Sequence, residues 1–255
     1  MNASYALVTG ASKGLGAGMA RHLADRGYSL LLVARNESQL HELADQLPGD
    51  HHRTLAGDLS ESTTIDRLLQ LVKDEALEIE VLINNAGFGD VGAILDRDWT
   101  LYQTMMRLNM ESLTRLSQHF GQIMEQRGNG YIMNVASTGA FQPNPNFAVY
   151  GASKAFVLNF SEAFNEELKG SGVSVTCLCP GPTRTEFHDR AQSGDSRIVR
   201  VLMMETDDVV KIGIDAMFAR RGTVIPGPAN AVLTFTERFT PRWLVPKMAK
   251  YLMSS

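Results

Sequence analysis

The 255-residue sequence lacks the features that mark secreted and membrane-spanning proteins. It holds only two cysteines, Cys177 and Cys179, and their spacing is too short for a comfortable disulfide within one extended strand. No apolar run approaches the roughly 18 to 20 residues that span a bilayer, and the start of the chain leads directly into a strand-like segment. We therefore expect no transmembrane helix, no signal peptide and a reduced, cytoplasmic location.

The sequence also lacks a large net charge of either sign. The 24 Lys and Arg and the 28 Asp and Glu residues give a net charge of −4, and the basic residues form no run, so we expect no nucleic-acid partner. His51 and His52 have no third ligand at a useful spacing and are interpreted as part of a loop rather than as a metal site. The content of 44% hydrophobic and 20% charged residues is typical of a globular protein with a sizeable core.

The sequence does contain a regular alternation of apolar, strand-like runs with segments of helical periodicity. Such alternation indicates βαβ units and a parallel sheet, and continuous apolar runs are typical of strands that helices cover on both faces. The expected strands are Tyr5–Thr9, Tyr28–Ala34, Arg53–Ala56, Val81–Asn84, Gly130–Ala136, Val173–Cys179 and Thr223–Pro226. The sequence therefore predicts an α/β fold with a doubly wound parallel sheet in a three-layer sandwich.

We expect one domain over residues 1–255, because no linker divides the chain into two compositions. Residues 181–208 mix Pro, Thr, Arg, Gly and Asp after a strand, which predicts an active-site flap. The tail at 229–255 carries Pro241 and Pro246, so only short helices are expected there. We expect the apolar side of this tail to pack against the domain.

A glycine-rich turn, TGASKGLG, follows the first expected strand. Gly10 would allow a sharp turn, Gly14 would let a pyrophosphate approach the backbone, and Gly16 would let helix and sheet pack closely. The helix N-terminus would then offer free amides to the phosphates. A tight turn without a ligand is the alternative, but the position within a βαβ unit favours a dinucleotide site.

An arginine follows the second expected strand, where a carboxylate would bind the 2′-hydroxyl of an NAD ribose. Arg35 comes directly after Ala34, and Lys13 lies within the glycine-rich turn. Two cations at this place would attract the 2′-phosphate of NADP, although both are also ordinary surface residues. We therefore expect NADP rather than NAD. Asp58, after the third strand, either faces the adenine or caps the next helix.

Tyr150 and Lys154 lie four residues apart in YGASK at the start of a helical pattern, so their side chains share one helix face. A lysine ammonium in a partly dry cleft would lower the pKa of the phenol and make it an acid–base group for a carbonyl or alcohol oxygen. Ser137 ends a strand at the same sheet edge, where its hydroxyl either binds that oxygen or caps a turn. Spacing alone gives Asn109 no role.

Taken together, TGASKGLG, NNAG at 84–87, Asn109, Ser137, YGASK and PGPTRT resemble the short-chain dehydrogenase/reductase family. The resemblance covers essentially the whole chain and implies a Rossmann-type sheet of about seven strands and a nicotinamide cofactor. It also implies a tetrad in which Tyr150 is the general acid–base and Ser137 orients the reacting oxygen. Lys154 would lower the pKa of Tyr150 and bind the nicotinamide ribose, and Asn109 would hold a water that relays protons.

The resemblance extends to the residues that would contact the cofactor. The glycine turn, the cations, NNAG and PGPTRT all contribute to this set. The expected cofactor-binding residues are Gly10, Ser12, Lys13, Gly14, Leu15, Gly16, Arg35, Asp58, Leu59, Asn85, Ala86, Gly87, Tyr150, Lys154, Pro180, Gly181, Thr183 and Thr185.

The implied reaction is the NADPH-dependent reduction of an aldehyde, ketone or 3-oxoacyl group to an alcohol, as in bacterial 3-oxoacyl and hydroxysteroid reductases. An apolar substrate is expected because Met and aromatic residues flank the motifs. The expected pocket residues are Phe88, Phe141, Pro143, Phe147, Phe187, Met203 and Met204. The alternative role for Arg184, Arg197 and Arg200, which is binding an acyl carrier's phosphate, is less favoured than simple solvation.

Two other functions are compatible with the same motifs. A redox-silent NADP(H) sensor would keep the fold, but such proteins typically lack the tyrosine or the lysine, and this chain has both. Epimerase and dehydratase relatives usually carry a separate substrate region that is not found here. By resemblance, segments Trp99–Arg127 and Val149–Lys169 would pair across a two-fold axis into a homodimer or homotetramer.

Overall fold

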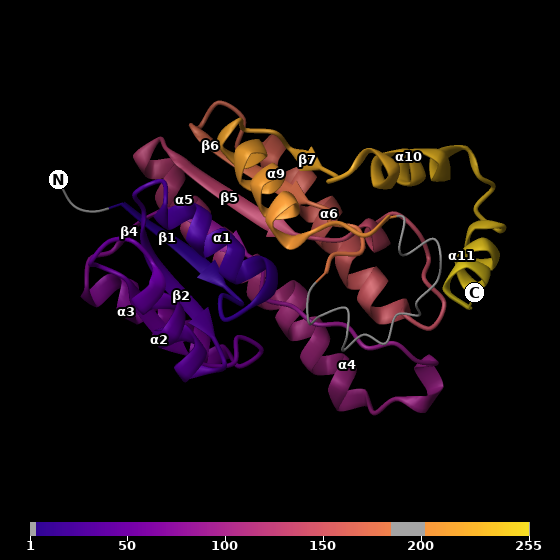
Figure 1. Ribbon diagram of the computed structural model, residues 1–255, viewed down its shortest axis with the longest axis horizontal. Helices are drawn as coiled ribbons and strands as arrows, with labels where there is room; N and C mark the ends of the chain where they lie inside the picture. The colour runs from indigo at the N-terminus through magenta and orange to yellow at the C-terminus, as the bar shows by residue number, and fades with distance from the viewer. Residues whose placement is uncertain (1–3, 185–201, 255) are drawn as a thin grey trace.

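A computed structural model describes residues 4–184 and 202–254 of the chain. Thr185, Phe187, Arg197 and Arg200, together with most of the expected flap, lie outside these described residues. The described strands form one parallel sheet of seven strands in the order β3-β2-β1-β4-β5-β6-β7 (Figure 1). They are β1 (Ser4–Thr9), β2 (Ser29–Ala34), β3 (Arg53–Ala56), β4 (Glu78–Asn84), β5 (Gly130–Val135), β6 (Val173–Leu178) and β7 (Thr223–Val224). The predicted doubly wound fold is confirmed.

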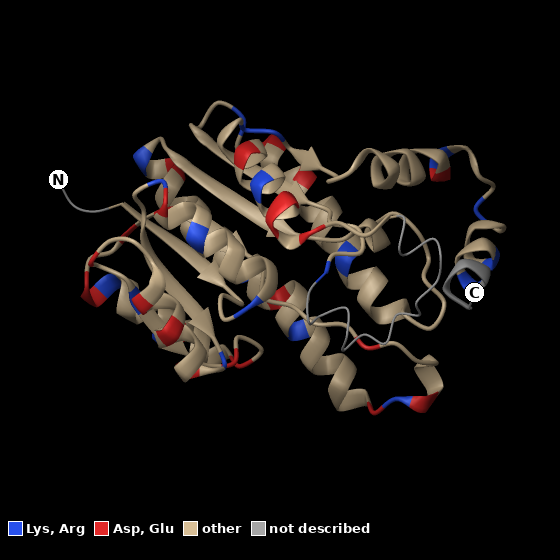
Figure 2. Cartoon of the chain, viewed as in Figure 1, with Lys and Arg blue, Asp and Glu red and all other residues tan. Residues whose placement is uncertain are grey.

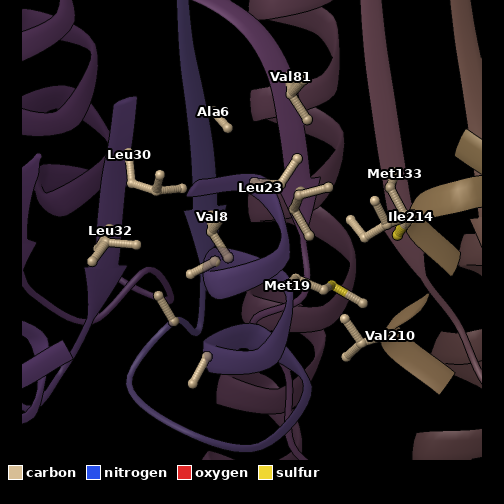
Figure 3. Packing of buried hydrophobic residues seen from close by; sticks show 14 of the residues in the cluster. Ala6, Val8, Met19, Leu23, Leu30, Leu32, Val81, Met133, Val210 and Ile214 are labelled. Atoms are coloured by element: carbon tan, nitrogen blue, oxygen red, sulfur yellow. The ribbon is translucent and has the colours of Figure 1, made fainter. Parts of the chain in front are cut away.

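Helices cover both faces of this sheet, as the continuous apolar strands predicted. One face packs against α1 (Gly14–Ala24), α2 (Glu37–Gln46) and α9 (Thr206–Phe218), with Met19 and Leu23 of α1 seated between the strands and α9 (Figure 3). The other face packs against α3 (Ser62–Asp74), α5 (Leu113–Arg127) and the end of α6 (Ala148–Glu167). Two apolar cores therefore hold the sheet rigid and leave its carboxyl edge open.

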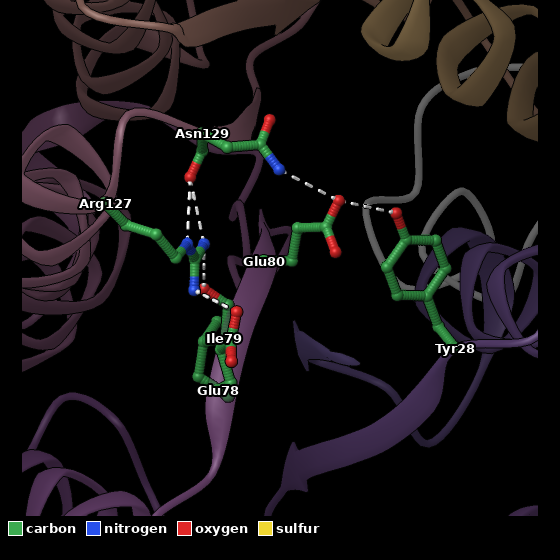
Figure 4. A network of polar contacts seen from close by, with 6 residues as sticks. All are labelled: Tyr28, Glu78, Ile79, Glu80, Arg127 and Asn129. Atoms are coloured by element: carbon green, nitrogen blue, oxygen red, sulfur yellow. Dashed lines mark hydrogen bonds and ion pairs between the residues drawn. The ribbon is translucent and has the colours of Figure 1, made fainter. Parts of the chain in front are cut away.

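β4 begins at Glu78, three residues before the predicted start at Val81. The prediction was too short because Glu78 and Glu80 interrupt the apolar pattern. A polar network pairs these residues (Figure 4). Arg127 lies 3.2 Å from Glu78 and donates to the Ile79 carbonyl at 3.0 Å, while Tyr28 and Asn129 both donate to Glu80 at 3.3 Å. The strand therefore extends through partners that come from distant parts of the chain.

The two adjacent histidines have a structural role. The ring of His52 accepts a hydrogen bond from the backbone N–H of Leu30 at 3.1 Å and lies 3.1 Å from the Pro48 carbonyl, and the His51 carbonyl accepts from the hydroxyl of Tyr5. Within residues 4–184 and 202–254, no three His, Cys, Asp or Glu side chains gather in a way that could hold a metal ion.

The C-terminal tail forms α10 (Pro228–Thr236), a short 3-10 helix at Glu237–Phe239 and α11 (Val245–Ser254). These short helices agree with the prediction from its prolines, but the expectation that the apolar side packs is wrong for Val232, Phe235, Phe239, Trp243 and Met248, which are exposed. These side chains stay exposed because α10 and α11 lie at one end of the molecule, beyond the sheet (Figure 1). No described helix is long and apolar enough to cross a bilayer.

Candidate active site

The glycine-rich turn joins β1 to the N-terminus of α1 at the carboxyl edge of the sheet. Gly10 and Gly14 have φ values of 65° and 55°, in the left-handed region that glycine tolerates best. A Cβ at Gly16 would overlap with the Gly10 carbonyl oxygen and lie 2.6 Å from Asn85 Nδ2. Lys13 precedes the helix in extended conformation without a side-chain cap, so the first turn of α1 offers backbone amides to an anion.

The segment after β4 holds this turn in place. The Asn85 side chain donates to the carbonyls of Thr9 and Gly10 at 3.0 and 3.1 Å. The Thr9 hydroxyl accepts from the backbone N–H groups of Asn85 and Ala86, both at 3.0 Å, and donates to the Ile83 carbonyl. NNAG and the glycine-rich turn are therefore one hydrogen-bonded unit, which holds the turn at the N-terminus of α1, where a dinucleotide pyrophosphate would bind.

Arg35 and Asp58 lie together at the ends of β2 and β3. Arg35 Nη1 is 3.8 Å from Asp58 Oδ2, and both side chains reach solvent. Asp58 Oδ1 accepts from the Ser60 N–H at 2.9 Å, whereas the N-cap of α3 is Glu61. Asp58 therefore closes the turn before α3 rather than capping the helix itself. Leu59, between Asp58 and Ser60, is buried in the core.

Tyr150 and Ser137 meet at the start of α6. Tyr150 is buried, and a hydrogen bond joins its hydroxyl to the Ser137 side chain. Ser137 Oγ also accepts from the Gly139 N–H at 3.1 Å, so the turn cap and the placement beside the phenol, which the sequence left as alternatives, occur together. Burial raises the pKa of Tyr150 to about 12, and the Ser137 hydrogen bond offsets this only in part.

Lys154 lies one turn further along α6, on the same side. Its ammonium donates to the Val135 carbonyl at 2.7 Å and lies 5.8 Å from the centroid of the Tyr150 ring. Burial lowers the pKa of Lys154 to about 8, against an upward influence of the nearby Cys177 and Cys179 thiols. Desolvation is the largest cause of the shift in the pKa of Tyr150, and the expected lowering of that pKa by Lys154 stays a prediction.

Asn109 sits in a π-helical segment, Arg107–Ser112, between α4 (Trp99–Met106) and α5. The side chain is buried and fully engaged: Oδ1 accepts from the Phe88 N–H at 3.1 Å, and Nδ2 donates to the Phe88 carbonyl and to Ser153 Oγ, both at 3.0 Å. A π-helical turn inside an α-helix is frequent at functional sites. Here it places Asn109 between the NNAG segment and α6.

Gly87 keeps the space between Asn109 and Lys154 open. A Cβ at this position would lie 3.0 Å from Asn109 Oδ1 and 3.4 Å from Lys154 Nζ. Any side chain there would therefore crowd both groups. Behind them, Asn84 donates to Ser117 and Asn134 at 2.9 Å, and Asn134 donates to Ser161, so a buried polar network ties β4 and β5 to the helices below the site.

The loop after β6 continues the same edge. The Pro180 carbonyl accepts from the Thr138 N–H at 2.8 Å, and Thr183 pairs with Met204 in an isolated parallel bridge. A Cβ at Gly181 would overlap with the side chain of Asn230 of α10. Asn230 donates to the carbonyls of Pro226 and Leu202 at 3.0 and 3.2 Å, so it ties Leu202 and the end of the segment after β7 to α10.

The expected pocket residues divide into two groups. Phe88 and Phe147 pack with Tyr150, Tyr102 and Met105 beside the tetrad, whereas Phe141 and Met204 pack against core clusters. Pro143 is exposed and Met203 is half-buried. Arg184 forms an exposed ion pair with Glu205 at 3.3 Å, in keeping with its interpretation as a solvated residue.

Sequence reasoning missed Asn144 and Gly89. Asn144 is buried and donates to the carbonyls of Gly139 and Gln142 at 2.7 and 2.8 Å, which holds the Ser137 turn against α6. A Cβ at Gly89 would lie 2.7 Å from both the Phe147 and the Tyr150 rings. The signal for Asn144 was slight, because an asparagine between two prolines in FQPNPNF indicates only a turn.

Known proteins are similar to this chain in sequence and in fold. A family model described as short chain dehydrogenase matches residues 4–196. An uncharacterized oxidoreductase of Staphylococcus epidermidis is 32% identical over 192 residues, which cover 75% of this chain and 83% of the relative. A 3-oxoacyl-[acyl-carrier-protein] reductase of Vibrio cholerae is 31% identical, with 73% and 76% covered. A short-chain dehydrogenase of Sphingobium yanoikuyae, solved in complex with NADPH, superposes with a TM-score of 0.82 at 33% identity, with 92% and 94% covered.

Proposed function

Because the chain belongs to the short-chain dehydrogenase/reductase family of oxidoreductases, we propose that it is an NADPH-dependent carbonyl reductase. The substrate would be an aldehyde, ketone or 3-oxoacyl group, and the product the corresponding alcohol. The observation that carries the proposal is the pair of hydroxyls, Tyr150 and Ser137, hydrogen-bonded at the carboxyl edge of the sheet with Lys154 beside them. Ligands of open α/β sheets bind at this edge.

The reaction divides between two hydroxyls and an ammonium. NADPH, when bound, supplies the hydride that the carbonyl carbon accepts. Ser137 holds the carbonyl oxygen by a hydrogen bond, and Tyr150 donates its proton to that oxygen as negative charge develops there. The Lys154 ammonium stabilises the resulting phenolate, which regains a proton from solvent along the side of Asn109 and Gly87.

The pKa shifts of the two groups fix the protonation states in which they enter the proposed reduction. With a pKa raised to about 12, Tyr150 is protonated near neutral pH and is available as a donor. With a pKa lowered to about 8, Lys154 exchanges its proton close to neutral pH. General acid catalysis is most efficient when the pKa of the donor lies near the working pH, so the proposal requires the Lys154 charge to lower the pKa of Tyr150 during the reaction.

The preference for NADPH follows from two cations at the carboxyl edge of the sheet, where the adenosine end of the cofactor would lie. Arg35 follows β2 and has an exposed guanidinium, and Lys13 is the N-cap residue of α1. Arginine binds phosphate in a bidentate manner. The Asp58 carboxylate lies 3.8 Å from the Arg35 guanidinium, so a 2′-phosphate would replace it as the partner of Arg35. The NADPH in the Sphingobium structure supports the same choice.

The proposed oligomer uses the outer face of α4, the π-helical segment and α5. A groove of about 590 Å³ lies there, lined by Trp99, Met106, Met110, Arg115 and Phe156 among others. Trp99 and Phe156 are exposed in the single chain. A two-fold partner that presents the same face would cover both residues.

The experiment is NADPH oxidation by the purified protein against a panel of aldehydes, ketones and 3-oxoacyl thioesters. The proposal predicts turnover on at least one apolar carbonyl, with the best substrates ranking its class. NADPH binding without turnover on any member of the panel would contradict the reductase and favour a redox-silent NADP(H) sensor.

A further inference from the structure

The C-terminal segment exposes several large apolar side chains between residues 228 and 250. Phe239 is 75% exposed and Trp243 is 67% exposed, and Val232, Phe235 and Met248 are exposed as well. We call these five side chains the tail surface. They come from α10, the 3-10 helix, the turn that precedes α11, and α11 itself, which follow one another at one end of the molecule (Figure 1). An apolar patch of this kind normally marks a binding surface.

The charge of the segment is opposite to that of the rest of the chain. Residues 228–255 contain four basic residues, Arg238, Arg242, Lys247 and Lys250, and one acidic residue, Glu237. The segment therefore has a net charge of +3, whereas the whole chain has −4, so the remaining residues carry −7. Figure 2 shows this basic stretch from the end of α10 to α11.

The basic and aromatic side chains are interleaved. Lys247 lies 5.2 Å from the Trp243 ring centroid, and Arg238 lies 6.0 Å from that of Phe235. Both oxygens of Glu237 are shielded from solvent and have no hydrogen-bond partner among the described residues, and burial raises the pKa of this carboxyl to about 7. The single acidic group therefore does little to offset the cations at the exposed face.

A second copy of the chain is a poor partner for this surface. A two-fold contact would bring two segments of charge +3 face to face. An anionic bilayer instead accepts each component: Trp and Phe at the headgroup level, Lys and Arg against the lipid phosphates, and the apolar side chains below them. We propose that the tail surface docks this protein on a membrane that contains anionic lipid, with α10 and α11 lying in the interface.

Docking would place the candidate site near the lipid. Asn230 of α10 is in contact with Gly181 and donates to the Leu202 carbonyl, so the tail joins the substrate end of the carboxyl edge directly. An apolar carbonyl compound dissolved in the membrane would then enter from the docked side. This last consequence rests on the proposed function, whereas the docking itself does not.

Co-sedimentation with vesicles tests the docking. Full-length protein is mixed with vesicles of phosphatidylglycerol and phosphatidylcholine, or of phosphatidylcholine alone. We expect binding to the anionic vesicles that weakens steeply with salt and is at least tenfold weaker on the neutral ones. Arg242→Glu with Lys247→Glu should weaken it at least about 25-fold, since each lost cation near an anionic surface costs about fivefold and each new carboxylate is repelled. Phe239→Ser with Trp243→Ser should abolish binding to the anionic vesicles.

Matched controls separate the tail surface from general effects of exposed residues. Leu95→Ser with Lys73→Glu changes an exposed apolar and an exposed basic residue elsewhere, and should leave vesicle binding unchanged. Equal loss in this control and in the tail variants, or equal binding to both vesicle types, would overturn the proposal. Tail-dependent self-association without vesicle binding would assign the surface to a second copy and overturn it as well.

Fluorescence gives a second readout that needs no tail variant. The chain has two tryptophans, Trp99 and Trp243, so Trp99→Phe leaves Trp243 as the sole emitter. We expect its emission to shift to the blue on anionic vesicles and to be quenched by lipids with brominated acyl chains. An unchanged spectrum at saturating lipid would contradict docking even if the tail variants failed to fold. Neither measurement depends on turnover, so the proposed reductase activity is tested separately.

Discussion

The ring of Phe147 stacks on the ring of Tyr150, with centroids 4.2 Å apart and planes inclined by 22°. Gly89 lies against both rings, because a Cβ there would come within 2.7 Å of each. The phenol is thus held between a helix that carries it, a neighbouring aromatic ring and a glycine without a side chain. Its hydroxyl can therefore stay beside Ser137 without a large loss of side-chain freedom on substrate binding.

Gly89→Ala should displace the Tyr150 ring and lower kcat. A shift of about 1 Å in a catalytic group can cost on the order of 100-fold, and we expect a loss of 10- to 100-fold with little change in NADPH affinity. Phe147→Leu in the same chain should recover part of the activity by making room. Gly222→Ala is the control, since its Cβ would meet only Asn165 at 3.4 Å. Steady-state kinetics with unchanged kcat in Gly89→Ala would refute the role of this packing.

The buried ammonium of Lys154 makes the stability of the fold depend on pH. Burial lowers its pKa to about 8 from an ordinary 10.5, so between these values the unfolded chain binds more protons and stability rises with pH. At pH 7 the penalty is on the order of 3 kcal/mol, since one pKa unit corresponds to about 1.4 kcal/mol. We expect Lys154→Met to raise the free energy of unfolding there by about 1–2 kcal/mol, because the Val135 carbonyl loses its donor.

Chemical denaturation at pH 7 and pH 10 measures this effect, and the advantage of the variant should shrink at the higher pH. The exposed Lys211, 3.9 Å from Asp215, provides the control, because Lys211→Met should change stability little at either pH. A Lys154→Met protein that is less stable than the parent at pH 7 would show that the ammonium stabilises the fold instead.

Arg35→Asp should weaken NADPH binding much more than NADH binding. Removing a cation and adding a carboxylate near the 2′-phosphate should cost at least about tenfold in the NADPH dissociation constant. NADH lacks that phosphate, so its affinity should change by less than threefold. Titration of cofactor fluorescence measures both, with Arg21→Asp as the control for a charge change of the same size on α1. Equal loss for the two cofactors would rule out Arg35 as the basis of the preference.

Phe156→Glu should dissociate the proposed oligomer. Phe156 is 40% exposed in the single chain and lines the groove on α4 and α5, and a buried, unpaired carboxylate in a subunit interface is costly. Sedimentation velocity should then report the mass of a single chain, whereas Ile212→Glu on α9, at the opposite face of the sheet, should leave the assembly intact. A parent protein that already sediments as a monomer would refute the interface.

The sequence was sufficient to predict the sheet and its carboxyl edge. Strand runs, the glycine-rich turn and YGASK are local patterns, and parallel order brings their ends together. β4 extends further than its apolar run because Arg127 and Tyr28, remote in sequence, pair with its two glutamates. Such pairing has no local signature, so it could not have been predicted.

The candidate site was predictable as a set of residues but not as a set of contacts. The rise in the pKa of Tyr150 depends on how deeply α6 is buried, and not on the spacing to Lys154. The roles of Asn144 and Gly89 depend on a loop that folds back on α6. The exposure of Trp243 and Phe239 also contradicts their apolar character, which predicts packing, because a binding surface and a core face look alike in sequence.

The central claim is that the Tyr150 hydroxyl donates the proton, and Tyr150→Phe tests it most directly. The substitution removes one oxygen and leaves a ring that can still stack on Phe147, so the fold and the NADPH dissociation constant should stay within about twofold of the parent. With the best carbonyl substrate of the panel, kcat should fall by about 1,000-fold or more. A variant that binds NADPH normally and keeps kcat within tenfold of the parent would contradict the account.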